Sequence, residues 1–255
     1  MFDEHSMAWR VVSRWPVLAG GPAALLLQVA HPSVAAGVAQ HSAYATDPFG
    51  RLERTLRAML SIAFGSPARR AEVLAELAAI HRGVTGVRDD GEPYRALDPF
   101  LQRWVWATLV HVAMEIERRY ALELGADERR QYYLESTEVA RAFRLPEELI
   151  PADLAAFEDY VAATVSELVV TDDARNVAWS VLHPEVWWMP RAVMVPLEWV
   201  TIDLLDDRLV REYGLPPLTS SRRRAVRGAK RFGRAVIPHL PEVVLANPLT
   251  RRAIA

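Results

Sequence analysis

Cysteine is absent from the 255-residue sequence. Without thiolates, the chain cannot form disulfides, zinc–thiolate sites, iron–sulfur clusters or cysteine-ligated haem. Any metal that it binds must therefore take its ligands from histidine, carboxylate, tyrosine or methionine side chains. The lack of cysteine also agrees with a reducing compartment.

An excess of charge and a long unbroken apolar run are both lacking. The formal net charge is −2, so composition gives no reason to expect binding to nucleic acid or to an acidic membrane. The stretch 17–38 is interrupted by glycine, proline, glutamine and histidine, whereas a membrane span needs about 20 apolar residues. Asp3 and Glu4 precede the first apolar run, unlike a signal peptide. We expect a soluble, cytoplasmic protein without stable membrane insertion, in which 17–38 is a buried helix.

Several catalytic signatures are also missing. The sequence contains no G-x-S-x-G elbow, P-loop, G-x-G-x-x-G or H-E-x-x-H motif. None of the 7 histidines has a glutamate three residues before it, so the Glu-x-x-His motif of di-iron helix bundles is absent.

What remains is helical periodicity along nearly the whole chain. Apolar spacing and capping residues predict helices over about 52–63, 67–84, 99–124, 127–143, 153–168, 172–179, 197–213 and 221–237. Pro184, Pro190 and Pro196 predict a broken connector, and no run alternates long enough for a strand. The sequence predicts one all-α domain, residues 1–255, with about nine or ten helices.

His81 falls on the apolar face of its predicted helix, among Leu74, Leu77, Ala78 and Val84. A lone imidazole on an apolar face suits a proximal haem ligand, because the apolar wall holds the porphyrin while one nitrogen reaches the iron. A core histidine bonded to a backbone carbonyl has the same pattern. The residues alone leave both interpretations open.

Arg51 and Thr55 share a helix face with Met59 and Ile62. An arginine on a partly apolar stripe needs a partner, which a haem propionate or a carboxylate of another helix would supply. Arg54 lies on the same helix.

Other polar residues carry weaker signals. His31-Pro32 interrupts an apolar stretch, so the imidazole either points into a pocket or caps a helix. His111 and Glu115, four residues apart, suit a metal or a buried hydrogen bond. The basic segment near the C-terminus predicts a solvated helix, with a nucleic-acid or phosphate-binding patch as the alternative; its members are Arg222, Arg223, Arg224, Arg227, Lys230, Arg231 and Arg234.

Four blocks together resemble a known family. They are LLLQVAHPSVAAGVAQHSAYATDPFGRLERT (25–55), IHRGVTG (80–86), YRALDPFLQRWVWATLV (94–110) and LVREYGLPP (209–217). In order and spacing they are similar to the catalytic domain shared by the latex-clearing rubber oxygenases and the MpaB oxygenase. The core of the resemblance covers about residues 20–217, and the basic helix and tail follow over 218–255.

The resemblance implies an all-α fold that encloses a b-type haem. The family's H-x-x-V-x-G block assigns iron ligation to His81. Its Arg-x-x-x-Thr pair corresponds to Arg51 and Thr55, which would orient the oxidant or anchor a propionate, and Arg54 lies beside them in the cofactor site. His31 is the candidate acid/base.

The sequence also departs from the family pattern. Arg54 stands where rubber oxygenases have a lysine that can cap the iron, and a protonated arginine is a poor iron ligand. No counterpart of their catalytic glutamate occurs between His31 and His41, which puts rubber-type cleavage in doubt. The leading hypothesis is a haem b-dependent oxygenase or peroxygenase that acts on a small apolar molecule with dioxygen or peroxide. The alternative is a non-catalytic haem-binding, gas-sensing or redox-sensing protein. A homo-oligomer is compatible with either.

Overall fold

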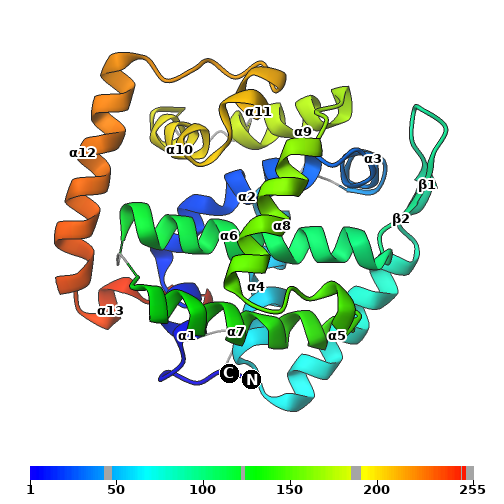
Figure 1. Cartoon of the computed structure of the whole chain (residues 1–255), viewed down its shortest axis with the longest axis horizontal. Coiled ribbons are helices and arrows are strands. Elements are labelled where there is room, and N and C mark those ends of the chain that lie inside the picture. The colour runs from blue at the N-terminus through cyan, green and yellow to red at the C-terminus, as the bar shows by residue number, and fades with distance from the viewer. Residues whose placement is uncertain (43–47, 122–123, 185–190, 248, 251–255) are drawn as a thin grey trace.

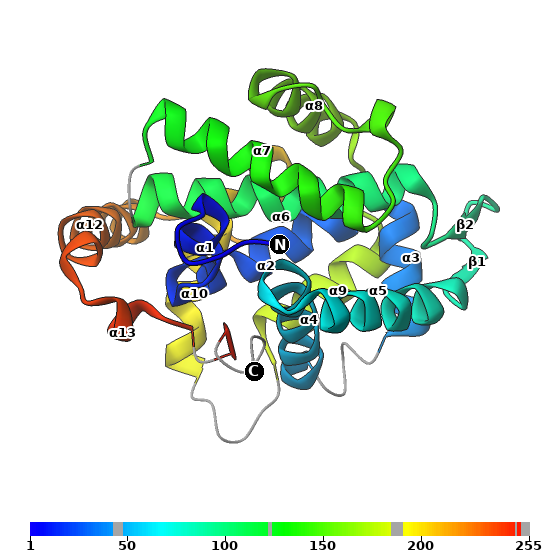
Figure 2. The ribbon, with the colours of Figure 1, turned by 90° about the horizontal axis from the view of Figure 1, so that it is seen from below.

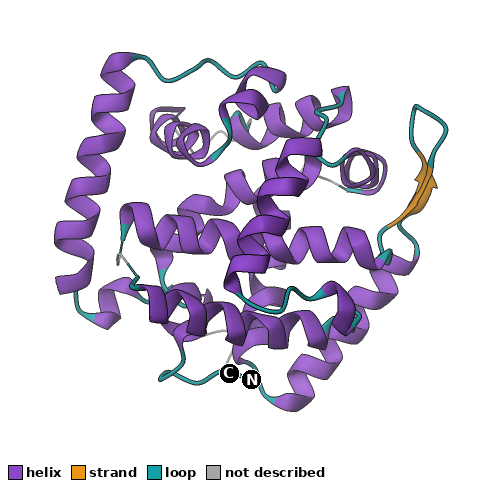
Figure 3. Ribbon diagram, viewed as in Figure 1, coloured by secondary structure: helices purple, strands orange, loops and turns teal. Residues whose placement is uncertain are grey.

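The computed structural model describes residues 1–42, 48–121, 124–184, 191–247 and 249–250, and most of them are helical (Figures 1 and 3). The predicted all-α class is confirmed. The predicted number of helices was too low, because two expected segments are each split into shorter helices and the short helices α1 and α13 were not predicted. The helices of the described residues are α1 (Met7–Val12), α2 (Gly21–Val29), α3 (Pro32–His41), α4 (Pro48–Phe64), α5 (Pro67–Arg82), α6 (Pro99–Tyr120), α7 (Ala126–Ala142), α8 (Leu154–Glu167), α9 (Asp172–Leu182), α10 (Arg191–Leu204), α11 (Asp207–Glu212), α12 (Ser220–Val236) and α13 (Glu242–Leu245), with 3-10 turns at Trp15–Gly20, Glu147–Leu149 and Ile237–His239.

Helix α6 runs through the middle of the molecule. Figure 2 shows α7 and α8 on one side of it and α2 and α10 on the other. Two clusters of buried side chains accordingly use different faces of α6: Trp106 and Val110 pack toward α7 and α8, while Trp104 and Val112 pack toward α2. Burial on both faces explains why this helix lacks the one-sided pattern of a surface helix.

Local chemistry sets where α6 begins. Asp98 caps it by accepting a hydrogen bond from the Phe100 backbone, and Pro99 occupies the first turn, as the sequence predicts. The helix ends at Tyr120, earlier than the predicted Leu124, because Ala121 leaves the helical region at φ −129° and ψ −92°.

The apolar stretch 17–38 was expected to form one buried helix. Instead, it is broken at His31-Pro32. Across this break the chain turns by 108°. Proline explains the break, since it cannot continue the hydrogen bonding of α2. Two carbonyls near the end of α2 are bonded from other helices: Leu26 by the Tyr213 hydroxyl at 2.6 Å and Leu27 by the Trp104 indole at 3.1 Å. Among the described residues no single helix is long and apolar enough to cross a membrane, although Trp15–Val29 and Pro32–His41 meet the criteria of length and composition as a bent pair.

Three further expectations were wrong. Pro196 lies inside α10 instead of breaking it, and apolar residues later in this helix, such as Ile202 and Leu204, are buried. The predicted helix over 197–213 is split between α10 and α11, because Asp206 caps a new helix. A small antiparallel sheet pairs β1 (Thr85–Val87) with β2 (Pro93–Arg95); strands this short show no alternation in the sequence.

The basic helix α12 is fixed to the body of the protein by close contact and by charge. Asp203 accepts hydrogen bonds from the Tyr120 hydroxyl at 2.9 Å and from the Lys230 ammonium at 2.8 Å. A Cβ placed on Gly233 would lie 2.0 Å from the Tyr120 carbonyl oxygen. Glycine is therefore required where α12 crosses the end of α6.

Two glycines of α12 provide a test of this contact. We expect Gly233→Ala to lower the free energy of unfolding by about 1–3 kcal/mol, because the backbone oxygen of Tyr120 cannot move aside cheaply. A Cβ at Gly228 meets nothing within 4 Å. Gly228→Ala should therefore raise stability by about 0.5–1 kcal/mol through helix propensity. Denaturant unfolding followed by circular dichroism measures both, and equal effects at the two positions would contradict the proposed close approach.

Candidate functional site

His81 lies in the last turn of α5. Ser66 caps the start of this helix, Gly83 follows its end, and the His81 side chain is half-buried. The Nδ1 atom of His81 lies 2.8 Å from the Leu77 carbonyl oxygen, one helical turn earlier. Because a carbonyl can only accept, Nδ1 carries a proton, and in the neutral ring the lone pair is on Nε2.

This arrangement is the one that orients a metal-binding imidazole, whose second nitrogen donates to a carbonyl or carboxylate. It also satisfies a purely structural histidine, so iron ligation by His81 stays a prediction. The apolar face around it is only partly covered: Val73 is buried, but Ile80 is 65% exposed. Leu77 was expected only as a neighbour on the face, and its role as the hydrogen-bond acceptor follows from the i−4 spacing.

The other predicted cofactor residues lie on α4, which packs against α5. The C-terminal half of α4 is buried, with Phe64 packed edge-on against Trp9 at 4.9 Å between ring centroids. The N-terminal half, by contrast, leaves Arg54 and Thr55 exposed. Arg51 belongs to this helix, but its side chain lies outside the described part of the structure.

These residues are compatible with a haem site. The protein would have to supply one imidazole with an available nitrogen to hold the iron, and His81 Nε2 would be that nitrogen. The Thr55 side chain is exposed and does not take part in the packing of the core. His81, Arg54 and Thr55 line neither of the two best-formed cavities of the described residues, and the structure does not show them enclosing a cofactor.

His31 caps α3. Its Nδ1 atom accepts a hydrogen bond from the Ser33 backbone at 3.2 Å, which confirms the capping alternative. Burial, followed by the positive charge of Arg88, lowers the pKa of His31, and the cap itself requires an unprotonated Nδ1. The segment after His81 contacts both ends of α3: Arg88 donates to Ser33 Oγ at 3.2 Å, and His41 Nε2 lies 3.1 Å from the Thr85 carbonyl oxygen. Since α3 has 10 residues, its ends are about 15 Å apart. The acid/base role of His31 stays a prediction.

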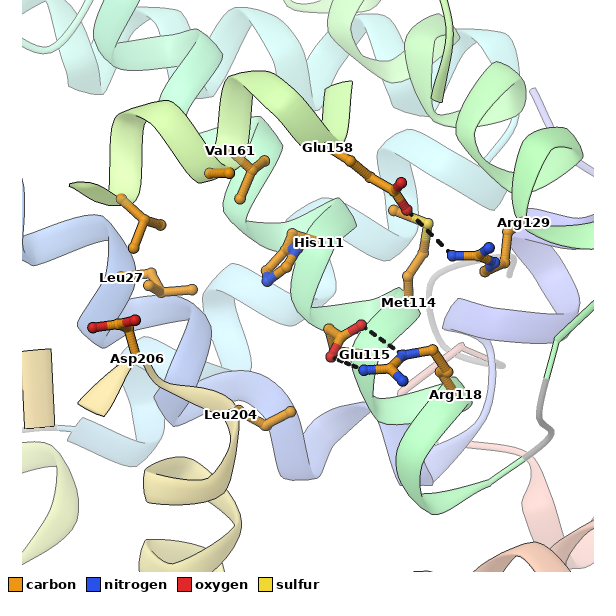
Figure 4. A pocket seen from close by; sticks show the side chains of 12 residues that line it. Leu27, His111, Met114, Glu115, Arg118, Arg129, Glu158, Val161, Leu204 and Asp206 are labelled. Carbon is orange, nitrogen blue, oxygen red and sulfur yellow. Dashed lines mark hydrogen bonds and ion pairs between the residues drawn. The ribbon is translucent and has the colours of Figure 1, made fainter. Parts of the chain in front are cut away.

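His111 and Glu115 line the larger cavity, of about 340 Å³, between α2, α6 and α8 (Figure 4). Burial opposes ionisation of Glu115, but Arg118 and Arg119 outweigh it and lower the pKa of the carboxyl to about 2. Burial lowers the pKa of His111. In the described part of the chain, no third histidine or carboxylate joins this pair in a metal-binding group. The i,i+4 spacing indicated the pair, but not the cavity, which depends on residues of other helices.

The predicted basic helix is confirmed as α12, and most of its arginines are exposed. Lys230 pairs with Asp203, and the Arg222 guanidinium lies 5.7 Å from the centre of the Trp199 ring. These two cations contribute to packing, and the alternative of a nucleic-acid-binding or phosphate-binding patch stays untested.

The capping role of His31 predicts pH-dependent stability. Its pKa in the folded protein is below the ordinary value of 6.5. The unfolded chain therefore binds the proton first, and the free energy of unfolding falls as the pH drops below about 6.5. His31→Asn keeps a capping group without titration, so it should reduce the loss of stability between pH 7 and pH 5. His31→Ala should cost about 1 kcal/mol at pH 7.

Urea unfolding at several pH values measures these effects. His239→Asn, at an exposed position in the C-terminal region, is the control and should leave the pH profile unchanged. If His31→Asn and the wild type lose stability in parallel, the cap does not titrate as inferred.

The chain is similar to known proteins over most of its length. Two uncharacterized proteins, from Mycobacterium tuberculosis (strain H37Rv) and Mycobacterium bovis (strain AF2122/97), are each 27% identical to the chain over 184 residues, which are 69% of this chain and 71% of each relative. No solved structure matches the chain significantly. The family described as ER-bound oxygenase mpaB/B'/rubber oxygenase, catalytic domain, matches residues 9–236. This chain is therefore a member of the MpaB/rubber oxygenase catalytic-domain family.

Proposed function

We propose that the protein is a haem b-dependent oxygenase or peroxygenase with a small apolar, unsaturated substrate. The observation that carries the proposal is the hydrogen bond from His81 Nδ1 to the Leu77 carbonyl, in a chain whose family is one of oxygenase catalytic domains. The bond fixes the ring and its tautomer, so that Nε2 is the nitrogen presented to iron.

The residues of α4 complete the proposed site. The haem, when bound, supplies the activation of dioxygen or peroxide. Arg51 and Arg54 carry the positive charge that haem propionates require, and Thr55 offers a hydroxyl that donates one hydrogen bond toward the oxidant. His31 Nε2 carries the proton that its capping geometry leaves there, so this atom is the candidate proton donor. The absence of cysteine suits a reducing cytoplasm, where we place the protein.

A non-catalytic haem protein that senses a gas or redox state is the second candidate. Two sequence features favour it: Arg54 replaces a lysine, and no glutamate lies between His31 and His41. A site without these groups can still bind haem through His81. The two functions therefore share the cofactor and differ in turnover.

Both candidate functions require haem to bind through His81. Absorption spectroscopy of the protein supplied with haem tests this requirement. We expect a Soret band in the wild type. His81→Gly should lose most of this band, because the variant lacks the proposed ligand. Added imidazole should restore the band, since a free imidazole fits the space that the side chain vacates. Rescue of this kind separates ligation from a general loss of folding.

His239→Gly is the control, because this histidine is exposed and lies on another part of the chain; its spectrum should equal that of the wild type. An unchanged Soret band in His81→Gly would refute ligation by His81. With haem bound, consumption of dioxygen or peroxide in the presence of unsaturated lipids or terpenoids supports the oxygenase, whereas substrate-independent autoxidation supports the sensor.

A further inference from the structure

One cavity of the described residues is separate from the predicted haem site. It has a volume of about 340 Å³, near the lower limit of about 300–1,000 Å³ for small-molecule pockets. Its walls come from α2, α6, α7 and α8, from the end of α10 and from Asp206, which caps α11. Residues this far apart in sequence meet only in the folded protein, and none of them belongs to the group His81, Arg51, Arg54 and Thr55.

The interior of this cavity is mainly apolar. Leu27, Met114, Val161 and Leu204 line it, and each of these side chains is buried in the protein. In Figure 4 the side chain of His111 points into the space between them. A ligand with an apolar body would bury its surface here, which is the main source of affinity for such molecules.

The charged residues around the cavity are already neutralised by one another or exposed to water. Both oxygens of Glu115 accept from Arg118, at 2.9 and 2.7 Å, and Arg129 lies 3.2 Å from Glu158, whose side chain is 52% exposed. Asp206 is exposed and accepts from the Arg208 backbone at 2.8 Å. A charged ligand would therefore find no unpaired counter-ion among these residues, and its desolvation would be uncompensated.

His111 is the exception among the polar groups of the cavity. In the described part of the structure its ring makes no hydrogen bond to another residue. Burial lowers the pKa of His111 and so favours the neutral imidazole. A neutral imidazole offers one donor and one acceptor. The ring is half-buried, and the cavity that it lines is the space from which water or a ligand can bond to it.

We propose that this cavity binds a small, uncharged, mainly apolar molecule, which forms one hydrogen bond from a hydroxyl or carbonyl group to His111. Alcohols, ketones and aldehydes with a short hydrocarbon body have this chemistry. The site requires no haem, so it extends the proposed function without depending on it.

Titration calorimetry with 1-octanol, octanoate and octylammonium tests this, because the three probes share a hydrocarbon chain and differ in charge. We expect 1-octanol to bind with one site per chain. The two ions should bind at least about tenfold more weakly. His111→Phe should weaken 1-octanol about threefold to tenfold through loss of one hydrogen bond, while His111→Gln, which keeps a donor and an acceptor, should retain more of the affinity.

A second experiment fills the cavity with a larger side chain. Val161→Trp should abolish binding, whereas Val169→Trp, at a position that is 58% exposed and outside the cavity lining, should leave it unchanged. Thermal unfolding verifies that each variant is folded. Tighter binding of either ion, or undiminished binding in both Val161→Trp and His111→Phe, would overturn the proposal, as would the absence of 1-octanol binding, which would mean that water alone fills the cavity.

The measurements are made on haem-free and haem-loaded protein. Binding of 1-octanol to a chain that takes up no haem would support the cavity and refute the proposed oxygenase. A Soret band without 1-octanol binding would have the opposite meaning. The two proposals therefore fail independently.

Discussion

Enclosure of α6 by other helices constrains the rest of the structure. Polar side chains on the enclosed faces of α6 are shielded from bulk water, so they need partners within the protein. Trp104 donates to the backbone of α2, and Thr108 accepts from Gln28 at 3.0 Å. Glu115 is bonded by arginines of its own helix. His111 has no such bond, and it lies where the surrounding helices leave a cavity. The cavity is therefore lined by an imidazole without a hydrogen-bond partner among the described residues.

Features fixed by a few neighbouring residues could be predicted from the sequence. Ser66, Asp98, Asp153 and Thr171 each cap the helix that follows them, because a cap requires only a side-chain oxygen and a backbone N–H two or three residues later. Features that depend on tertiary burial could not. The continuation of α10 through Pro196 is the clearest case, since local propensity opposes it and only packing against the remainder of the protein can offset the lost hydrogen bond.

The candidate site also combines local features, which the sequence predicts, with features that depend on tertiary packing. The spacing from Leu77 to His81 is one helical turn, so the hydrogen bond that orients the imidazole is a local consequence of the sequence. The position of Thr55 relative to that ring depends on how α4 packs against α5, and helical periodicity contains no information about it. The cavity near His111 was inaccessible for the same reason: its lining comes from helices that the pattern of α6 does not specify.

The two histidines illustrate how hydrogen bonding determines what an imidazole can bind. At His81 one nitrogen is committed to a carbonyl, which fixes the ring, selects the tautomer and leaves a single lone pair in a defined direction; a metal ion requires all three. At His111 neither nitrogen has a partner among the described residues, so the neutral ring can donate or accept and can adapt to a hydroxyl or a carbonyl. Membership of an oxygenase family determines the helical scaffold that both residues share, but it does not determine the ligand of either. The different surroundings of the two rings make them suited to different partners within one fold.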